Sequence, residues 1–364
     1  MSAMPLHILI SRTDNIGDVV LTLPMVARLK EINPDSRITF LCREYVSPLV
    51  KMSRLVDDVV ELEKIVDDPV SYFKQAGIDV VIFAQPDKQL AWAAIKAGIP
   101  HRIGNARHKI FNMLTCNRRV FFRKGSSDSH EAQQNFEFLR HFGCLEIPDI
   151  SSLSGDYNFR VPHIAEVEKI IAPQKFNVIL HTKSNGHGRE WPIGHYLRLA
   201  QELHSSDESI QIWLTGSQAE GKWIEVNCPE LLRLPHVGNL CGRFSLEQLI
   251  VFINASDGLI ASGTGPLHIS AALGQRTLGL FPPKRPMHPG RWAPVGLKAQ
   301  YLSAETACTD CPDVAGGACD CMRKILPSVV AKIVGQWLDD KKISDRSKLA
   351  TNLHGGSDAQ SMAK

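Results

Sequence analysis

The stretch RTDNIGDVVLTLP, residues 12–24, places charged side chains where an apolar run, LHILIS, gives way to a stretch with helical spacing. This pattern predicts a strand, a short loop and a helix that begins near Val19. Asp18 stands just before that helix, in a loop at the carboxyl end of the strand, where open α/β sheets place ligands. An aspartate at this position also commonly caps a helix, and spacing alone favours the cap.

A second turn from strand to helix lies in DGLIASGTGPLHISAALG, residues 257–274. We expect the strand to end at Ser262 and Pro266 to occupy the first helical turn. The free amide groups and the positive dipole end of this helix could hold a diphosphate. A tight turn without any ligand would have the same sequence pattern. If a ligand binds here, two glycines allow its close approach and two side chains can donate hydrogen bonds: Gly263, Gly265, Thr264 and His268.

Residues 101–124 contain seven Lys or Arg and no Asp or Glu. Such a basic segment could bind the phosphates of a ligand or an anionic membrane surface. It could equally solvate the outer sides of strands. The candidate anion-binding residues in this segment are Arg102, Arg107 and Lys109.

Four cysteines lie close together in a loop rich in glycine, proline and aspartate: Cys308, Cys311, Cys319 and Cys321. Four thiolates could bind a structural zinc ion. Because their spacing is irregular, we expect reduced thiols or a disulfide rather than zinc.

The elements that carry these motifs alternate between strands and helices in two similar series. This pattern predicts an α/β protein with two Rossmann-like domains that face each other across a central cleft. We place the first domain at residues 1–160 and the second at 161–340. Residues 341–364 are polar and aperiodic, and we expect a flexible tail there.

Composition restricts the class of protein further. The 364 residues carry a formal net charge of +3, far from the strong basic excess of a nucleic-acid binder. We find no signal peptide and no apolar run long enough to span a bilayer. Nine cysteines in a chain of this length, without an export signal, indicate reduced thiols and a cytoplasmic protein.

Three separated motifs together resemble glycosyltransferase family 9, the lipopolysaccharide heptosyltransferases and their relatives. They are RTDNIGDVVLTLP, GNLCGRFSLEQLIVFINASDGLIASGTGPLHISAALG and LFPPKRPMHPGRW. The resemblance implies a GT-B fold, in which the N-terminal domain binds the acceptor and the C-terminal domain binds a nucleotide sugar. It also implies an inverting transfer in which Asp18 is the catalytic base. We count Arg12, with Arg102, Arg107 and Lys109, among the candidate acceptor-binding residues.

The resemblance further implies how the donor is held. The segment HTKSNGHGREWP would bind the diphosphate and Glu220 the ribose. No Asp-x-Asp pair stands in an obvious loop at a strand end, so we expect neither a catalytic metal nor a cofactor. The implied donor-binding residues are Thr182, Lys183, Ser184, Arg189, Glu220, Gly263, Thr264, Gly265 and His268.

One departure from the family concerns the donor sugar. Many heptosyltransferases have an acidic residue where this chain has Gly263, so ADP-heptose is the family's default donor and another hexose or a deoxyhexose stays possible. The expected acceptor is a lipopolysaccharide core or a related surface glycan at the inner membrane. The alternatives are a GT-B nucleotide-sugar epimerase and a non-catalytic module that binds a nucleotide sugar.

Overall fold

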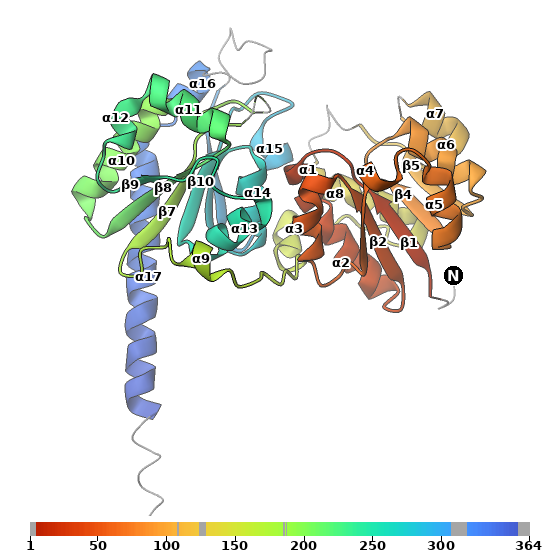
Figure 1. The fold of residues 1–364 in the computed structure, drawn as a ribbon, viewed down its shortest axis with the longest axis horizontal. Helices are drawn as coiled ribbons and strands as arrows, with labels where there is room; N and C mark the ends of the chain where they lie inside the picture. Colours follow the sequence, from red (N-terminus) through yellow and green to blue (C-terminus); the bar gives the residue numbers. More distant parts are fainter. Residues whose placement is uncertain are drawn as a thin grey trace, which may run out of the picture.

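The computed structural model describes residues 5–107, 109–123, 129–184, 186, 188–306 and 319–355. Within them the chain forms two domains, each built on a six-stranded sheet (Figure 1). The first sheet is parallel and has the order β3-β2-β1-β4-β5-β6. Its strands are β1 (His7–Ser11), β2 (Arg37–Cys42), β3 (Asp58–Glu61), β4 (Val80–Phe83), β5 (His101–Asn105) and β6 (Arg118–Val120).

The second sheet is also parallel and repeats this topology in the order β12-β11-β10-β7-β8-β9. Both sheets have the Rossmann strand order, which agrees with the two Rossmann-like domains that the alternating pattern predicted. Ligands bind such sheets at the carboxyl ends of the two strands where the order reverses, here β1 and β4, and β7 and β10. The strands are β7 (Phe176–His181), β8 (Ile210–Thr215), β9 (Val237–Asn239), β10 (Gly258–Ser262), β11 (Arg276–Phe281) and β12 (Ala299–Ser303).

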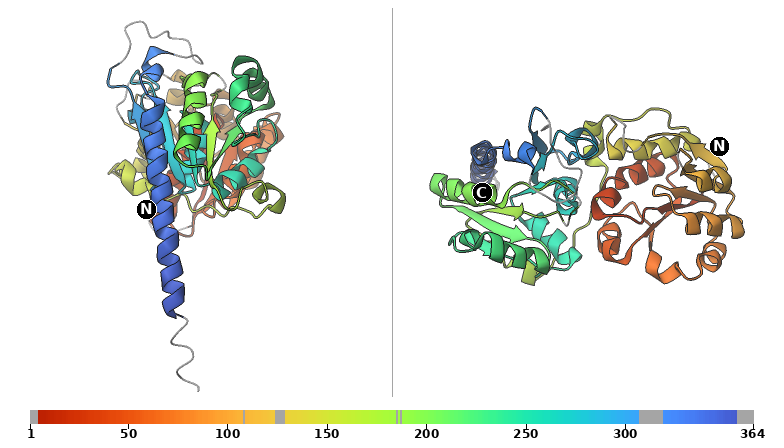
Figure 2. Two further views of the ribbon diagram at one scale, coloured as in Figure 1. Left: turned by 90° about the vertical axis from the view of Figure 1, so that its left-hand side faces the viewer. Right: turned by 90° about the horizontal axis from the view of Figure 1, so that it is seen from above.

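Helices cover both faces of each sheet (Figures 1 and 2). Those of the first domain are α1 (Ile16–Val20), α2 (Leu23–Ile32), η1 (Glu44–Val46), α3 (Ser47–Lys51), α4 (Leu62–Ile65), α5 (Pro69–Ala76), α6 (Lys88–Lys96), α7 (Ile110–Thr115), α8 (Glu131–Phe136), η2 (Glu137–Phe142) and η3 (Ile150–Gly155). Those of the second are α9 (Ala165–Glu168), α10 (Ile193–Ser206), α11 (Gln218–Asn227), α12 (Pro229–Leu232), α13 (Leu246–Ala255), α14 (Gly265–Ala272), α15 (Pro289–Trp292), α16 (Asp320–Arg323) and α17 (Pro327–Gly355).

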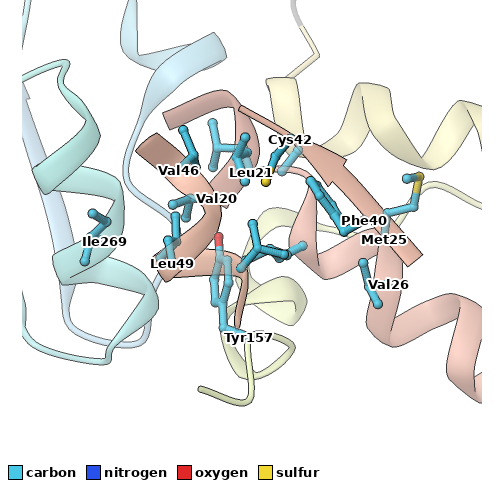
Figure 3. Close-up of a cluster of buried hydrophobic side chains, with 14 of the residues drawn as sticks. Val20, Leu21, Met25, Val26, Phe40, Cys42, Val46, Leu49, Tyr157 and Ile269 are labelled. Atoms are coloured by element: carbon cyan, nitrogen blue, oxygen red, sulfur yellow. The ribbon is translucent and has the colours of Figure 1, made fainter. Parts of the chain in front are cut away.

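A continuous apolar seam joins the two domains. One cluster of buried side chains includes Val20 of α1 and Leu49 of α3 from the first domain and Ile269 of α14 from the second (Figure 3). Tyr157, close to the domain connection, is buried in the same cluster. Because this surface is removed from water, it stabilises the packed arrangement of the domains.

The C-terminal helix is longer than the sequence pattern predicted. We expected a flexible tail from residue 341, but α17 continues to Gly355 and extends past the body of the second domain (Figure 2). Lys341 and Lys342 form ion pairs with Asp257 and Asp207. Residues 336–354 contain no glycine or proline. The helix can therefore continue through its intrinsic helix propensity, even though the hydrophobic periodicity is lost. The expectation is therefore wrong for 341–355, and residues 356–364 lie outside the described part.

Candidate active site

Two glycines bring the amino ends of α1 and α14 together across the cleft. A Cβ atom on Gly17 would lie 2.9 Å from Cδ2 of His268, and one on Gly265 would lie 2.8 Å from Cβ of Ile16. Side chains do not pack this closely, so glycine is required at both positions. The turn between β1 and α1 and the turn between β10 and α14, which the sequence singled out separately, thus belong to one site.

A cavity of about 550 Å³ opens between these two turns. This volume falls within the roughly 300–1,000 Å³ of ligand pockets. Asp18 lines the cavity from the first domain. Seven of the predicted donor-binding residues line it from the second: Ser184, Arg189, Glu220, Gly263, Thr264, Gly265 and His268. The structure therefore brings the predicted base and most of the predicted donor site together.

Asp18 occupies the first turn of α1. The helix begins at Ile16 after Asn15, so the alternative that Asp18 caps a helix beginning at Val19 is wrong. Its Oδ1 atom accepts a 2.5 Å hydrogen bond from Nη2 of Arg12. This charged hydrogen bond fixes the orientation of the carboxylate at the cavity wall.

Arg12 is completely buried and lies among three carboxylates. Its Nε donates to Asp14 at 2.7 Å, and Nη2 donates to Glu131 at 3.0 Å as well as to Asp18. Burial alone would lower the pKa of Arg12, but Asp18, Asp14 and Glu131 outweigh it, so that the pKa is raised above its ordinary value. Arg12 was expected to contact the acceptor. Because its side chain is 0% exposed, that expectation is wrong, and Arg12 orients Asp18 instead.

The loop after β7 presents Arg189 to the cavity. Its side chain is buried and lines the cavity together with Ser184. The Ser184 hydroxyl donates to the Gly188 carbonyl at 3.1 Å, which ties the loop together. Thr182 is buried without lining the cavity, and its Oγ1 has no hydrogen-bond partner in the described part of the chain. Arg189 is therefore the cation best placed for a diphosphate.

Lys183 points elsewhere. Its Nζ lies 2.5 Å from Oε2 of Glu190 and 3.7 Å from the centroid of the Trp223 ring. Lys183 is not part of the cavity lining, although the sequence placed it with the donor-binding residues. The ammonium charge already has a carboxylate and an aromatic face as neighbours.

Glu220 combines a structural contact with a place at the cavity. Its Oε2 accepts a 2.7 Å hydrogen bond from the amide of Ser217, and the Ser217 hydroxyl accepts one from the Glu220 amide. This capping box starts α11. The carboxylate also lines the cavity, so its position is compatible with the ribose contact implied by the family.

Two buried histidines stand where the domains meet. Burial lowers the pKa of His268 to about 3 and that of His130 to about 4. Both rings are therefore neutral at neutral pH. The Nε2 atom of His130 lies 2.8 Å from the carbonyl of Ala293 in the second domain, and its Nδ1 accepts from the Ala132 amide. His130 thus donates a hydrogen bond across the domain boundary.

Gly263, the departure from the family pattern, has an aromatic neighbour. A Cβ atom there would lie 2.9 Å from Cε1 of Phe281. The ring of Phe281 therefore occupies the space that a side chain at position 263 would need. An acidic residue at 263 would require Phe281 to move.

The predicted acceptor residues are split between the two ends of the first sheet. Arg102 lies at the start of β5, away from the cleft, and its guanidinium donates to the carbonyls of Thr115 and Ile99. It is wrongly placed for an acceptor in the cleft. Arg107 and Lys109 follow the carboxyl end of β5, on the cleft side. A second, polar cavity of about 450 Å³ opens on this side between the loops after β1, β2 and β4, where Arg43 and Tyr45 line it.

The cysteine cluster is only partly covered by the structure. Cys308 and Cys311 lie outside the described residues. Cys319 and Cys321 are buried and pack against each other. Within the described part, no group of three or more His, Cys, Asp or Glu side chains could hold a metal ion. No helix of that part is both long enough and apolar enough to span a membrane.

Comparison with known proteins identifies the family. The model of glycosyltransferase family 9 (heptosyltransferase) matches residues 72–315. The chain belongs to glycosyltransferase family 9. It is 20% identical to the lipopolysaccharide core heptosyltransferase OpsX of Haemophilus influenzae, over 78% of this chain and 81% of that protein.

Solved structures agree with this family at the level of the fold. The Escherichia coli ADP-heptose lipopolysaccharide heptosyltransferase II has a TM-score of 0.71 and 19% identity, covering 93% of this chain and all of that one. Escherichia coli heptosyltransferase WaaC with ADP has a TM-score of 0.66 and 17% identity, covering 91% and 100%. This heptosyltransferase-like glycosyltransferase therefore has the predicted GT-B fold.

Sequence reasoning missed two residues near the base. Glu131 stands in none of the motifs quoted from the sequence, and Arg291 stands only within the motif LFPPKRPMHPGRW. In the structure Glu131 Oε1 accepts from Arg12, and Glu131 Oε2 accepts from Nη2 of Arg291 at 3.0 Å. The sequence signal was weak, because these residues are 119 and 160 positions from their partners.

Proposed function

We propose that this protein is an inverting glycosyltransferase that moves heptose from ADP-heptose to a lipopolysaccharide core. The observation that carries the proposal is the cavity that Asp18 shares with the α14 amino terminus and Arg189. A base on one wall and a diphosphate-binding turn on the other are what a single displacement requires.

In the proposed reaction, the oxygen of an acceptor hydroxyl attacks the anomeric carbon of the donor sugar. Asp18 takes the hydroxyl proton, and Arg12 holds one carboxylate oxygen so that the other faces the acceptor. The bond between the anomeric carbon and the diphosphate oxygen breaks, and the nucleoside diphosphate leaves from the opposite face. Arg189 and the free amides of α14 stabilise the charge on this leaving group without a metal.

The names of the structural neighbours support ADP-heptose, because those structures were solved as ADP-heptose lipopolysaccharide heptosyltransferase II and as WaaC with ADP. Gly263 and Phe281 make a comparison with other sugars necessary. We therefore propose ADP as the nucleotide and heptose as the sugar to test first, against UDP-, GDP- and CMP-linked sugars.

We also propose that the enzyme works at the anionic surface of the inner membrane. From Lys88 to Ser127 the chain has nine Lys and Arg residues and no Asp or Glu. On α7, Ile110 and Leu114 are 80% and 67% exposed. Basic and apolar side chains together suit a charged bilayer surface that carries a lipid-anchored acceptor.

The test is turnover of ADP-heptose with and without a heptose-free lipopolysaccharide core. Asp18→Asn should lower kcat by about 10²–10⁴-fold, because it removes the base while keeping the shape of the side chain. Asp35→Asn, in an exposed turn, is the matched control. Conversion of donor without acceptor would indicate an epimerase, and binding without any turnover would indicate a binding module. Near-normal turnover of Asp18→Asn would refute the mechanism.

A further inference from the structure

Four charged side chains form an unbroken chain from the base to the second domain. Asp18 binds Arg12, Arg12 binds Glu131, and Glu131 binds Arg291, with N–O distances of 2.5, 3.0 and 3.0 Å. Negative and positive charges alternate along it. The first three residues belong to the first domain, and Arg291 belongs to α15 of the second.

Two details of geometry allow this series of ion pairs to transmit a movement of Arg291 to Asp18. Asp18 and Glu131 both accept from the same nitrogen atom of Arg12, Nη2. Glu131 uses its other oxygen, Oε2, for both Nε and Nη2 of Arg291. A shift of Glu131 therefore changes the position of the nitrogen that holds Asp18.

The surrounding residues exclude water from the centre of this series of ion pairs and hold its members in place. Arg12 and Glu131 are buried, so neither can replace a lost partner with bulk water at little cost. Asn135 of the same helix as Glu131 accepts a further hydrogen bond from Nη1 of Arg12. His130, the residue before Glu131, donates to the carbonyl of Ala293, two residues after Arg291. The α8 amino terminus is thus attached to the second domain at two neighbouring points.

We propose that Glu131 is a positioning residue that couples the packing of the second domain to the orientation of Asp18. When Arg291 is in contact, Glu131 holds Arg12 in the position that directs Asp18 toward the acceptor. When the domains separate, Glu131 loses Arg291 and shifts with Arg12. The base is then correctly oriented only while the donor domain is packed against the acceptor domain. This inference rests on Asp18 being the base.

The experiment is a mutant cycle on the full chain with ADP-heptose and a heptose-free lipopolysaccharide core. Glu131→Gln and Arg291→Gln should each lower kcat by about 10–100-fold, the cost of a slightly misplaced catalytic group. The KM for ADP-heptose should stay within about twofold, because neither residue lines the donor cavity. The double variant should be no worse than either single one, since both act through the same contact.

Three further variants make the outcome specific. Arg291→Lys, which keeps the charge, should recover part of kcat. Glu137→Gln removes a carboxylate with an exposed partner, Arg140, just after α8, and should leave kcat unchanged. In an Asp18→Asn background, Glu131→Gln should have little further effect. If Glu131→Gln does not fold, Arg291→Gln tests the same coupling from the other domain.

The outcomes separate this inference from the proposed function. Unchanged kcat in Glu131→Gln or Arg291→Gln, or effects that multiply in the double variant, would overturn the coupling while a strong loss in Asp18→Asn still supports the base. Turnover retained in Asp18→Asn would overturn the proposed base itself.

Discussion

Two cations near the donor cavity differ in where their side chains lie. Lys183 has Glu190 at 2.5 Å and the ring of Trp223 beneath its ammonium group. Arg189 is buried and lines the cavity. A guanidinium also presents several donors in a fixed plane, which suits a diphosphate better than an ammonium group does. The structure therefore assigns unequal roles to two residues that the sequence placed together.

This difference predicts the effect of removing each charge. Arg189→Met should weaken ADP binding by about 10–100-fold, because a charge-assisted contact to the diphosphate is lost. Lys183→Met should change it by no more than about threefold, since an ammonium group with existing partners makes a small contribution. Titration calorimetry with ADP would measure both. Equal losses in the two variants would show that Lys183 leaves Glu190 when the donor binds.

At the residue scale, the sequence identified functional side chains within a motif. It did not identify the residues from distant parts of the sequence that contact them. Asp18, Arg189 and His268 stand in local patterns that a reader of the chain can see. The assignment of Arg12 to the acceptor failed because its burial depends on Glu131 and Asn135, more than a hundred residues away. A single sequence contains no record of such contacts.

At the element scale, alternating strands and helices predicted the parallel sheets well, because buried parallel strands are short continuous apolar runs. Helix boundaries were harder to predict. The expected helix after β1 is split into α1 and α2, where Pro24 at the start of α2 cannot donate a backbone hydrogen bond. The extension of α17 was missed because propensity, rather than periodicity, maintains it.

Helices α6 and α7 pack side by side at the end of the first domain that faces away from the second (Figure 1). On α6, Lys88, Trp92 and Lys96 recur every four residues and are all exposed. They lie on one side of the helix. Tryptophan flanked by lysines is typical of helices at a membrane interface. With Ile110 and Leu114 on α7, these residues define the proposed membrane-facing surface.

This surface predicts selective binding to anionic vesicles. The protein should float with vesicles that contain phosphatidylglycerol and not with pure phosphatidylcholine, and salt should weaken binding. Leu114→Ser together with Trp92→Ser should lower the partition coefficient by about tenfold or more, because apolar area no longer enters the interface. Leu297→Ser, 80% exposed on the second domain, is the control and should have no effect. If all variants bound the vesicles equally well, α6 and α7 would not be the membrane-facing surface.

At the scale of the whole molecule, the active site exists only where two independently recognisable domains meet. The two domains are held together by the apolar seam between α1, α3 and α14. Their relative position is fixed by the ion pair of Glu131 with Arg291 and by the hydrogen bond of His130 to Ala293. The fold class could be predicted from each half alone. The relative position of the halves depends on contacts that neither half specifies by its own pattern.

These contacts make the stability of the packed molecule depend on pH. Burial lowers the pKa of His130 to about 4, whereas an unfolded histidine titrates near 6.5. Below about pH 6.5 the unfolded chain therefore binds a proton that the folded chain does not, and the free energy of unfolding falls until about pH 4. For His130 the loss is of the order of 3 kcal/mol at most. Glu131 raises the pKa of His130 and Arg291 lowers it, so the effects of these two neighbouring charges partly cancel.

His130→Asn should flatten this dependence, because asparagine can still cap α8 but does not titrate. Urea unfolding of wild type and variant between pH 7 and pH 4.5 would measure the slope. His163→Asn, at an exposed position, is the control and should keep the wild-type slope. His268 should contribute a similar fall in the wild type, since its pKa is lowered to about 3, so the slope of His130→Asn should be reduced rather than zero. An unchanged slope would mean that His130 becomes accessible to protons before the domains unfold.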